Sequence, residues 1–302
     1  MKILLAGGTG FLGRHIGHNL IEGGHEVTVL SRDPDKVAAV KELEGANATR
    51  GDVTDPRSLI GTMTGADAVV CAVQFPNHPV EVPRKGLTYD NYDRRGTENL
   101  LAEGAGAGVR RFAYVSGAGA NTASDKTWYR AKGFAERAII RSGLSYAIVR
   151  PSWAYGPEDR ALNRLAAIAR FSPVVPQLGI KPQHIQPVSC HDIALAFRRI
   201  FERDEAWNET YEIGGPDVMT MHEVLETLLE VLGKRRLIVP IPAFLAKLGT
   251  APLVLLPKPP MTPHGIEFAI QDGVVDTEIL HKVLDVHPVP LREGLSRYMG
   301  AA

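Results

Sequence analysis

Three glycines near the N-terminus, each three residues after the last, have the clearest chemical meaning in this chain. They fall between an apolar run at 3–6 and an amphipathic segment at 11–21, which indicates a strand, a tight turn and a helix. In such a turn the first glycine allows the sharp bend, the second lets the backbone approach a pyrophosphate, and the third lets helix and strand pack closely. Free N–H groups at the start of the helix favour the phosphates. The residues assigned to this dinucleotide site are Gly7, Thr9, Gly10, Phe11, Leu12 and Gly13.

The end of the second apolar strand, at 27–30, indicates which dinucleotide is bound. An acidic residue there would accept hydrogen bonds from the ribose hydroxyls of NAD. The chain has Ser31 and Arg32 instead, which suit the extra 2′-phosphate that NADP carries on this ribose. An arginine binds such a phosphate through two parallel hydrogen bonds. We therefore expect NADP, with NAD as the alternative, and we interpret Asp33 as the N-cap of a helix that runs to about residue 43. Topology alone adds Asp52, Val53 and Ala72 to the cofactor site.

The elements that must position these residues alternate between strand and helix through the first half of the chain. Apolar strands separated by helices predict a parallel sheet covered on both faces, an α/β Rossmann-type doubly wound fold. After Pro151 the prolines cluster and the pattern becomes irregular, which predicts a smaller C-terminal substrate lobe. We expect a dinucleotide-binding domain over 1–150 with 185–215 returning to it, and a smaller lobe over 151–184 and 216–302.

Composition excludes several classes of protein. The 302 residues carry 34 basic and 34 acidic side chains, so a broad basic surface for nucleic acid is not expected. No apolar run reaches the roughly 18 residues of a membrane-spanning helix, and the first residues do not resemble a secretory signal. Two cysteines, Cys71 and Cys190, are too few for a disulfide framework, which favours a reducing, cytoplasmic location.

Six short motifs lie along the chain between residues 7 and 216. They are GGTGFLG at 7–13, RGTENLL at 95–101, RFAYVS at 111–116, YRAK at 129–132, RP at 150–151 and YEIGGP at 211–216. Together they resemble the short-chain dehydrogenase/reductase superfamily, in its extended and atypical branches, over residues 1 to about 285. The pieces at 215–217, 219–220 and 261–263 resemble the atypical subgroup that includes a nucleotide-binding accessory subunit of respiratory complex I.

The resemblance implies a catalytic tyrosine and a lysine four residues later, which holds the nicotinamide ribose and lowers the pKa of the tyrosine. It also implies a serine or threonine after the fifth strand. Lys132 matches the lysine, but Trp128 stands four residues before it. Tyr129, three residues before it, lies near the same helix face but is rotated by about 60°, so it would serve only if the helix starts irregularly. Ser116 is the candidate hydroxyl, followed by a loop at 117–120 that has none.

Two hypotheses follow from this departure. In the first, Tyr129, Lys132 and Ser116 form a displaced but working reductase or epimerase centre. In the second, cofactor binding persists while hydride chemistry is lost, which indicates an NADP(H)-binding sensor, scaffold or assembly protein. Lys132 binds the cofactor ribose in both.

The loop after the sixth strand is expected to pass the nicotinamide, because it does so in the superfamily that the chain resembles. Pro151 is therefore added to the cofactor site, and Trp153 and Tyr155 are candidates for the wall of a substrate cleft. The alternative is that both aromatic residues are buried in the seam between the lobes.

Two further features point to partners or are set aside. Leu237–Leu256 is apolar and broken by proline, and it predicts a lid, core packing, a protein-partner surface or a patch on a membrane surface. An open apolar cleft there would suit a small apolar substrate such as a quinone.

Cys190, His191 and Asp192 are adjacent, and neighbours in an extended segment point to opposite faces, so we expect no catalytic dyad and interpret Asp192 as a helix cap. The ten histidines show no metal-ligand spacing, so no metal is expected.

Overall fold

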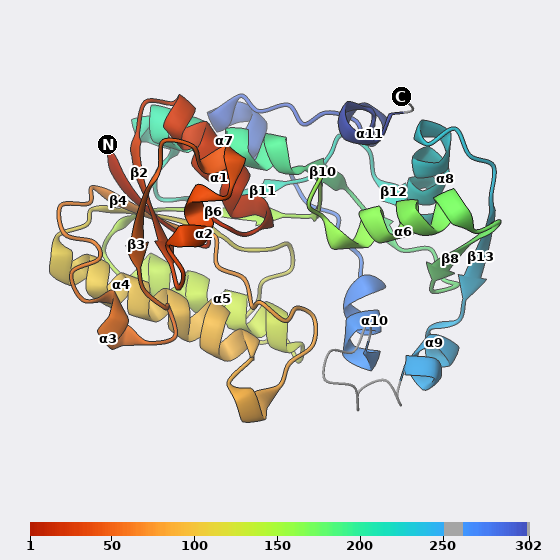
Figure 1. The fold of residues 1–302 in the computed structure, drawn as a ribbon, viewed down its shortest axis with the longest axis horizontal. Helices are drawn as coiled ribbons and strands as arrows, with labels where there is room; N and C mark the ends of the chain where they lie inside the picture. Colours follow the sequence, from red (N-terminus) through yellow and green to blue (C-terminus); the bar gives the residue numbers. More distant parts are fainter. Residues whose placement is uncertain (251–261, 301–302) are drawn as a thin grey trace.

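The computed structural model describes residues 1–250 and 262–300 (Figure 1). Its main sheet has seven strands: β1 Lys2–Ala6, β2 Glu26–Ser31, β3 Asn47–Arg50, β4 Ala68–Cys71, β5 Arg111–Val115, β6 Ser145–Pro151 and β11 Glu209–Ile213. They lie in the order β11-β6-β5-β4-β1-β2-β3, and all the pairs are parallel. The strand order reverses between β1 and β4, which is where doubly wound sheets bind dinucleotides. The predicted Rossmann-type fold is confirmed.

Different helices cover the two faces of this sheet. They are α1 Phe11–Glu22, α2 Asp35–Ala38 and α7 Cys190–Glu202 on one face, and α3 Pro56–Leu59, α4 Gly96–Ala107 and α5 Thr127–Arg141 on the other (Figure 1). Alternate residues of a strand point to opposite faces, so Ile3 and Leu5 pack toward α1 and α7, whereas Leu4 and Ala6 pack toward α4 and α5. All four are buried, which is typical of a parallel sheet covered on both sides.

A smaller set of elements lies beyond the carboxyl ends of the central strands (Figure 1). The π-helical turn η6 Leu280–Leu284 is not part of this set, because it packs on the main sheet beside α7. The smaller set comprises β7 Trp153–Tyr155, α6 Arg160–Phe171, β8 Val174–Leu178, β9 His184–Ile185, β10 Pro187–Ser189, β12 Met219–Thr220, α8 Met221–Val231, β13 Leu237–Ile241, α9 Ala243–Thr250, α10 Pro263–Ala269 and α11 Leu291–Met299. Its core is formed by apolar residues of α6, α8 and α11. The end of the predicted apolar stretch, 251–256, lies outside the described residues. No helix in the described ranges is both long and apolar enough to cross a bilayer.

Two helix starts differ from the sequence prediction. The helix expected after Asp33 is broken into α2 and a short turn at Lys41–Leu43, because Val40 between them is extended, and Asp33 pairs with Lys36 instead of capping the helix. The later helix, α7, begins at Cys190, and its N-cap is Ser189, which accepts a hydrogen bond from the N–H of His191. Asp192 lies inside the first turn and accepts from the N–H of Val289 at 3.1 Å.

Candidate functional site

The glycine turn joins β1 to α1 with no room for side chains. Gly7 has a φ of +85°, and a Cβ on it would lie 2.5 Å from the carbonyl oxygen of Ala72, in the loop after β4. A Cβ on Gly13 would overlap the carbonyl oxygen of Gly7. These two glycines therefore let β1, β4 and α1 meet at the point where the sheet order reverses. Gly10 is exposed and is the N-cap of α1.

The start of α1 offers free backbone donors to an anion. Gly10 has no side chain to cap the helix, so the first N–H groups, beginning at Phe11 and Leu12, face outward with the positive end of the helix dipole. Arg14 fixes the turn, because its guanidinium donates to the carbonyl oxygens of Gly10 at 3.3 Å and Thr9 at 3.2 Å. Sequence reasoning did not assign Arg14. Its place one turn into the helix was the available signal.

Two guanidinium groups lie at the end of β2 that was assigned to the 2′-phosphate. Arg32 is exposed and forms no ion pair with any residue that the structure describes. Arg50, at the end of β3, pairs in register with Ser31 and donates to the carbonyl oxygen of Arg32 at 3.2 Å. The nearest acid, Asp33, is paired with Lys36 at 3.2 Å. Sequence reasoning missed Arg50, because only the strand order places β3 beside β2.

The three residues that topology alone added to the cofactor site already make contacts within the protein. Asp52 accepts hydrogen bonds from the N–H and the hydroxyl of Thr54, at 2.9 and 2.8 Å. Val53 is buried, and its carbonyl oxygen accepts from Asn99 at 2.8 Å. Ala72 is half-buried and donates its N–H to Ala6. These loops therefore offer backbone and apolar surface to a bound nucleotide.

Lys132, on α5, points to a carboxylate that sequence reasoning did not assign. Its Nζ lies 3.2 Å from Oδ1 of Asp93, 3.3 Å from the carbonyl oxygen of Val115, and 5.3 Å from the ring centre of Tyr114. Asp93 lies in the π-helical turn Asp90–Arg95, has no exposed surface, and also accepts from the N–H of Phe75. Burial raises the pKa of Asp93, while the Lys132 charge opposes that rise. The Lys132 ammonium, which was predicted to bind the cofactor ribose, is thus already paired with a carboxylate.

Tyr129 lies on the start of α5, next to the loop that follows β5. Its ring lies directly over Gly119, where a Cβ would be 2.9 Å from the ring carbons. No hydrogen bond joins Tyr129 to Lys132 within the part of the chain that the structure describes. Burial raises the pKa of Tyr129, which is opposite to the shift that a catalytic tyrosine needs.

Trp128 occupies the position four residues before Lys132 and is buried in an aromatic cluster. Its indole ring lies 5.4 Å from the ring of Phe268 on α10 and 6.3 Å from that of Tyr89. His78 lies between the same two residues: its Nδ1 is 2.5 Å from the Tyr89 hydroxyl, and its ring is 4.5 Å from Phe268. Burial lowers the pKa of His78 to about 4, with Lys132 and Arg160 adding to the shift. Trp128 is therefore packed among aromatic side chains and the neutral imidazole of His78.

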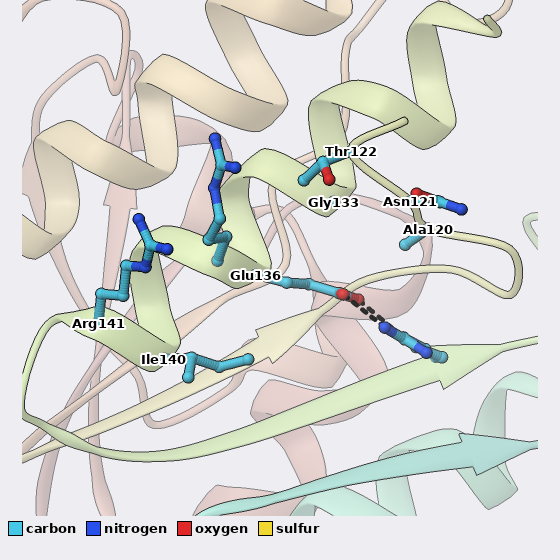
Figure 2. A pocket seen from close by; sticks show the side chains of 9 residues that line it. Ala120, Asn121, Thr122, Gly133, Glu136, Ile140 and Arg141 are labelled. Atoms are coloured by element: carbon cyan, nitrogen blue, oxygen red, sulfur yellow. Dashed lines mark hydrogen bonds and ion pairs between the residues drawn. The ribbon is translucent and has the colours of Figure 1, made fainter. Parts of the chain in front are cut away.

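Ser116 is not brought to Tyr129. Its hydroxyl is buried and donates to Oε1 of Glu136 at 2.5 Å. Glu136 in turn accepts two hydrogen bonds from Arg150, at 2.9 and 2.6 Å. A pocket of about 320 Å³ lies between α5 and the loop at 120–122, and Glu136 and Arg150 are among the residues that line it (Figure 2). The predicted catalytic hydroxyl therefore belongs to a structural network.

The loop after β6 contributes less to a cleft than the sequence predicted. Pro151 is buried, and its carbonyl oxygen accepts from Ala118 at 2.9 Å. Trp153 is half-buried. Tyr155 has no exposed surface and packs in the core of the smaller lobe, with its hydroxyl against Gly294 on α11. Its prediction as a substrate wall is therefore corrected: strand β7 turns this side chain away from the sheet and into the lobe.

Comparisons with known proteins show the family and the fold of this chain. The family of NAD(P)H-binding proteins matches residues 7–170. The chain is 29% identical to the Arabidopsis thaliana mitochondrial NADH dehydrogenase [ubiquinone] 1 alpha subcomplex subunit 9, over 82% of this chain and 61% of that protein. It is 27% identical to the 2-alkyl-3-oxoalkanoate reductase of Stenotrophomonas maltophilia, over 78% of this chain and 77% of the reductase. An Escherichia coli NADPH-dependent quinone oxidoreductase, solved with NADPH, has the same fold, with a TM-score of 0.76 and 20% identity over 98% of this chain and 99% of that one.

Proposed function

Because this chain belongs to the family of NAD(P)H-binding proteins, we propose that it binds NADP(H) at the turn 7–13 and has lost the working Tyr–Lys centre. Membership in this family confirms the resemblance found in the sequence motifs. Binding of an NAD(P) dinucleotide is common to the family, whereas the preference for NADP(H) and the loss of the centre are our proposals.

The residues present fit the dinucleotide. The uncapped start of α1, fixed by Arg14, suits the pyrophosphate. Arg32 and Arg50 suit the 2′-phosphate, because both are exposed and neither forms an ion pair among the described residues. When bound, the nicotinamide supplies a hydride acceptor or donor at the carboxyl ends of the central strands.

One observation carries the loss of the centre: the Lys132 ammonium is held 3.2 Å from the buried Asp93 carboxylate. A tyrosine acid or base depends on a nearby cation to bring its pKa toward neutrality. No hydrogen bond joins Tyr129 to Lys132 among the described residues. The ammonium of Lys126 lies 5.8 Å from the centre of the Tyr129 ring, and burial still raises the pKa of Tyr129. Ser116 donates to Glu136, so its hydroxyl is already engaged, and the residues directly after it, 117–120, carry no other hydroxyl to orient a carbonyl. A tyrosine whose pKa is raised stays protonated and exchanges its proton poorly at neutral pH, which supports the proposed loss of the centre.

A second candidate is an oxidoreductase for a small apolar substrate, such as a quinone. It is favoured by the aromatic cluster of Trp128, Tyr129 and Phe268 beside Lys132 and by the reductase relative. In this function, substrate binding would displace Lys132 from Asp93 and let Tyr129 act.

Titration with NADPH and with NADH, followed by tryptophan fluorescence, tests the first proposal. We expect tighter binding of NADPH and no NADPH oxidation with a panel of quinones and ketones. Turnover at ordinary enzyme rates would refute the loss of the centre and establish the second candidate. Binding of neither dinucleotide would refute both.

Partners and location remain proposals of the same kind. The Arabidopsis relative is named as a subunit of NADH dehydrogenase, so a protein partner is proposed for the non-catalytic function. We propose a reducing compartment, the cytoplasm, because Cys71 and Cys190 are both free and buried. Cell fractionation tests the location, since the Arabidopsis relative is named as mitochondrial.

A further inference from the structure

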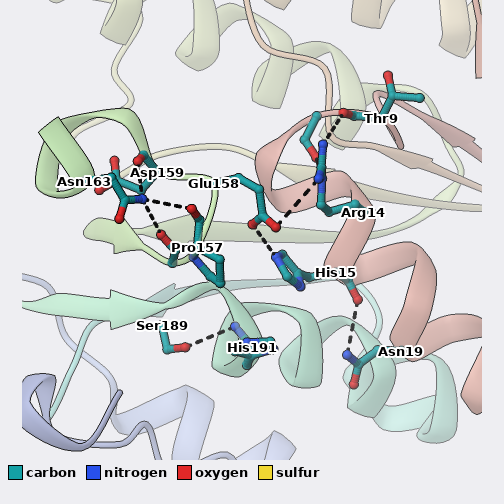
Figure 3. Close-up of polar contacts among 12 residues, drawn as sticks. Thr9, Arg14, His15, Asn19, Pro157, Glu158, Asp159, Asn163, Ser189 and His191 are labelled. Carbon is teal, nitrogen blue, oxygen red and sulfur yellow. Dashed lines mark hydrogen bonds and ion pairs between the residues drawn. The ribbon is translucent and has the colours of Figure 1, made fainter. Parts of the chain in front are cut away.

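Three side chains with metal-binding atoms meet at the contact between α1 and α7. They are His15, Cys190 and His191, and their donor atoms all lie within 4.8 Å of one another. His15 and Cys190 are buried, whereas His191 is exposed. The two imidazole rings are 4.8 Å apart and nearly perpendicular. Figure 3 shows His15 on α1 and His191 at the start of α7, facing the same space.

A fourth group, Glu158, lies beside His15. Its Oε2 is 2.8 Å from Nε2 of His15, and its other oxygen is 3.6 Å from Arg14 (Figure 3). The loop that carries it is held in place: Asn163 donates to three of its carbonyl oxygens, and Asp159 caps α6 through the N–H groups at 161 and 162. A carboxylate on one nitrogen of a metal-binding histidine fixes its tautomer and leaves the other nitrogen to the metal.

We propose that His15, Cys190 and His191 bind a Zn²⁺ ion, with Glu158 orienting His15 or completing the coordination. Thiolate and imidazole ligands together favour zinc over magnesium or calcium. Ligand atoms around tetrahedral zinc lie roughly 3.3–3.6 Å apart, given metal–ligand distances of about 2.0–2.3 Å. The donor atoms, now within 4.8 Å of one another, must therefore move closer together to bind zinc. The exposed side chain of His191 has room to make this movement.

The sequence prediction of no metal rested on the spacing of the histidines, and a separate interpretation of 190–192 as extended excluded a catalytic dyad. The fold changes both. Spacing rules find ligands that are close along the chain, but His15 and Cys190 meet only through the packing of α1 on α7. The adjacent pair 190–191 was read as extended, with side chains on opposite faces. Both residues lie in the first turn of a helix instead, where neighbours are about 100° apart and can share one ion.

The position of this site predicts what zinc would do. It would tie α1, whose first turn forms the dinucleotide site, to α7 and to the loop at 156–159. We expect zinc to raise the thermal unfolding temperature, because it binds the folded chain in preference to the unfolded one.

The test is titration of the full, tag-free chain with Zn²⁺ against a chromophoric chelator, and with Co²⁺ followed by absorbance. We expect one Zn²⁺ per chain, and a thiolate-to-Co²⁺ band together with the visible bands of tetrahedral Co²⁺. Cys190→Ser should remove the thiolate band and lower the Zn²⁺ affinity more than about tenfold. His15→Gln should lower the affinity similarly.

Matched controls separate this site from other donors. Cys71→Ser changes the other free cysteine, and His287→Gln breaks the exposed, stacked His281–His287 pair, so both should leave binding and spectrum unchanged. The proposal is overturned if the native chain binds no stoichiometric Zn²⁺, or if Cys190→Ser, folded by circular dichroism, retains the thiolate band. NADPH titration of the zinc-free chain is a separate measurement, so failure here leaves the dinucleotide proposal standing.

Discussion

Nζ of Lys132 lies 3.2 Å from Oδ1 of Asp93, a carboxylate with no exposed surface. A charge pair inside the protein is strongly held, since removing either partner leaves the other buried and uncompensated. This contact joins α5 to the turn before α4 and occupies the ammonium that the sequence assigned to a cofactor ribose.

The Asp93–Lys132 pair should be visible in a double-mutant cycle. We expect Asp93→Asn and Lys132→Met each to lower the free energy of unfolding by about 3–5 kcal/mol, and the double variant to cost less than the sum. Urea unfolding measures all four chains. Additive effects would show that the two groups are not coupled.

Stability should fall in mild acid because of His78. Its pKa is lowered to about 4 in the folded chain from an ordinary value of 6.5, so the unfolded chain binds the extra proton. The contribution is present above pH 6.5 and is lost as the pH falls toward 4, by at most about 3 kcal/mol. His78→Gln should flatten this part of the stability curve measured by urea unfolding. His287→Gln, at an exposed position, should not change it.

The preference for NADPH should depend on two arginines from neighbouring strands. We expect Arg32→Ala and Arg50→Ala each to weaken NADPH binding roughly tenfold, the loss of one hydrogen-bonded charge pair, while NADH binding stays within twofold. Isothermal titration measures both ligands. Arg57→Ala, another exposed arginine on nearby α3, is the control. Equal losses for NADH and NADPH would place these arginines away from the 2′-phosphate.

The glycine turn allows a paired test of one methyl group. Gly13→Ala should abolish dinucleotide binding and destabilise the chain, because the new Cβ would overlap the carbonyl oxygen of Gly7. Gly106 is an exposed position on α4, where a new Cβ would have nothing within 4 Å. Gly106→Ala should therefore raise the free energy of unfolding by about 0.5–1 kcal/mol. Thermal unfolding and NADPH titration of both variants give the comparison.

Ser116 should matter for stability and not for cofactor binding. Ser116→Ala removes the donor to Glu136 and should lower the free energy of unfolding by about 1–3 kcal/mol. The Kd for NADPH should stay within twofold of the native value. A large loss of NADPH binding with unchanged stability would instead place Ser116 at the cofactor site.

The sequence alone determined the features that depend on near neighbours. Alternating apolar runs and helices determined the doubly wound sheet, and the spacing of Gly7, Gly10 and Gly13 determined the dinucleotide turn, because both patterns are written within about 20 residues of chain. The capping box from Thr220 to Glu223 is equally local, because its hydrogen bonds join residues three apart in the sequence.

Tertiary structure alone decided which charged and polar groups meet. Asp93 forms an ion pair with Lys132, and Glu136 accepts a hydrogen bond from Ser116. Arg50 donates to the carbonyl oxygen of Arg32. Each contact joins two different elements across a turn or a crossover. His15 and Cys190 are brought together from α1 and α7 in the same way. Periodicity fixes which face of an element is buried. It does not fix which polar groups meet across that face, because their partners come from elements far away along the chain and are selected by packing.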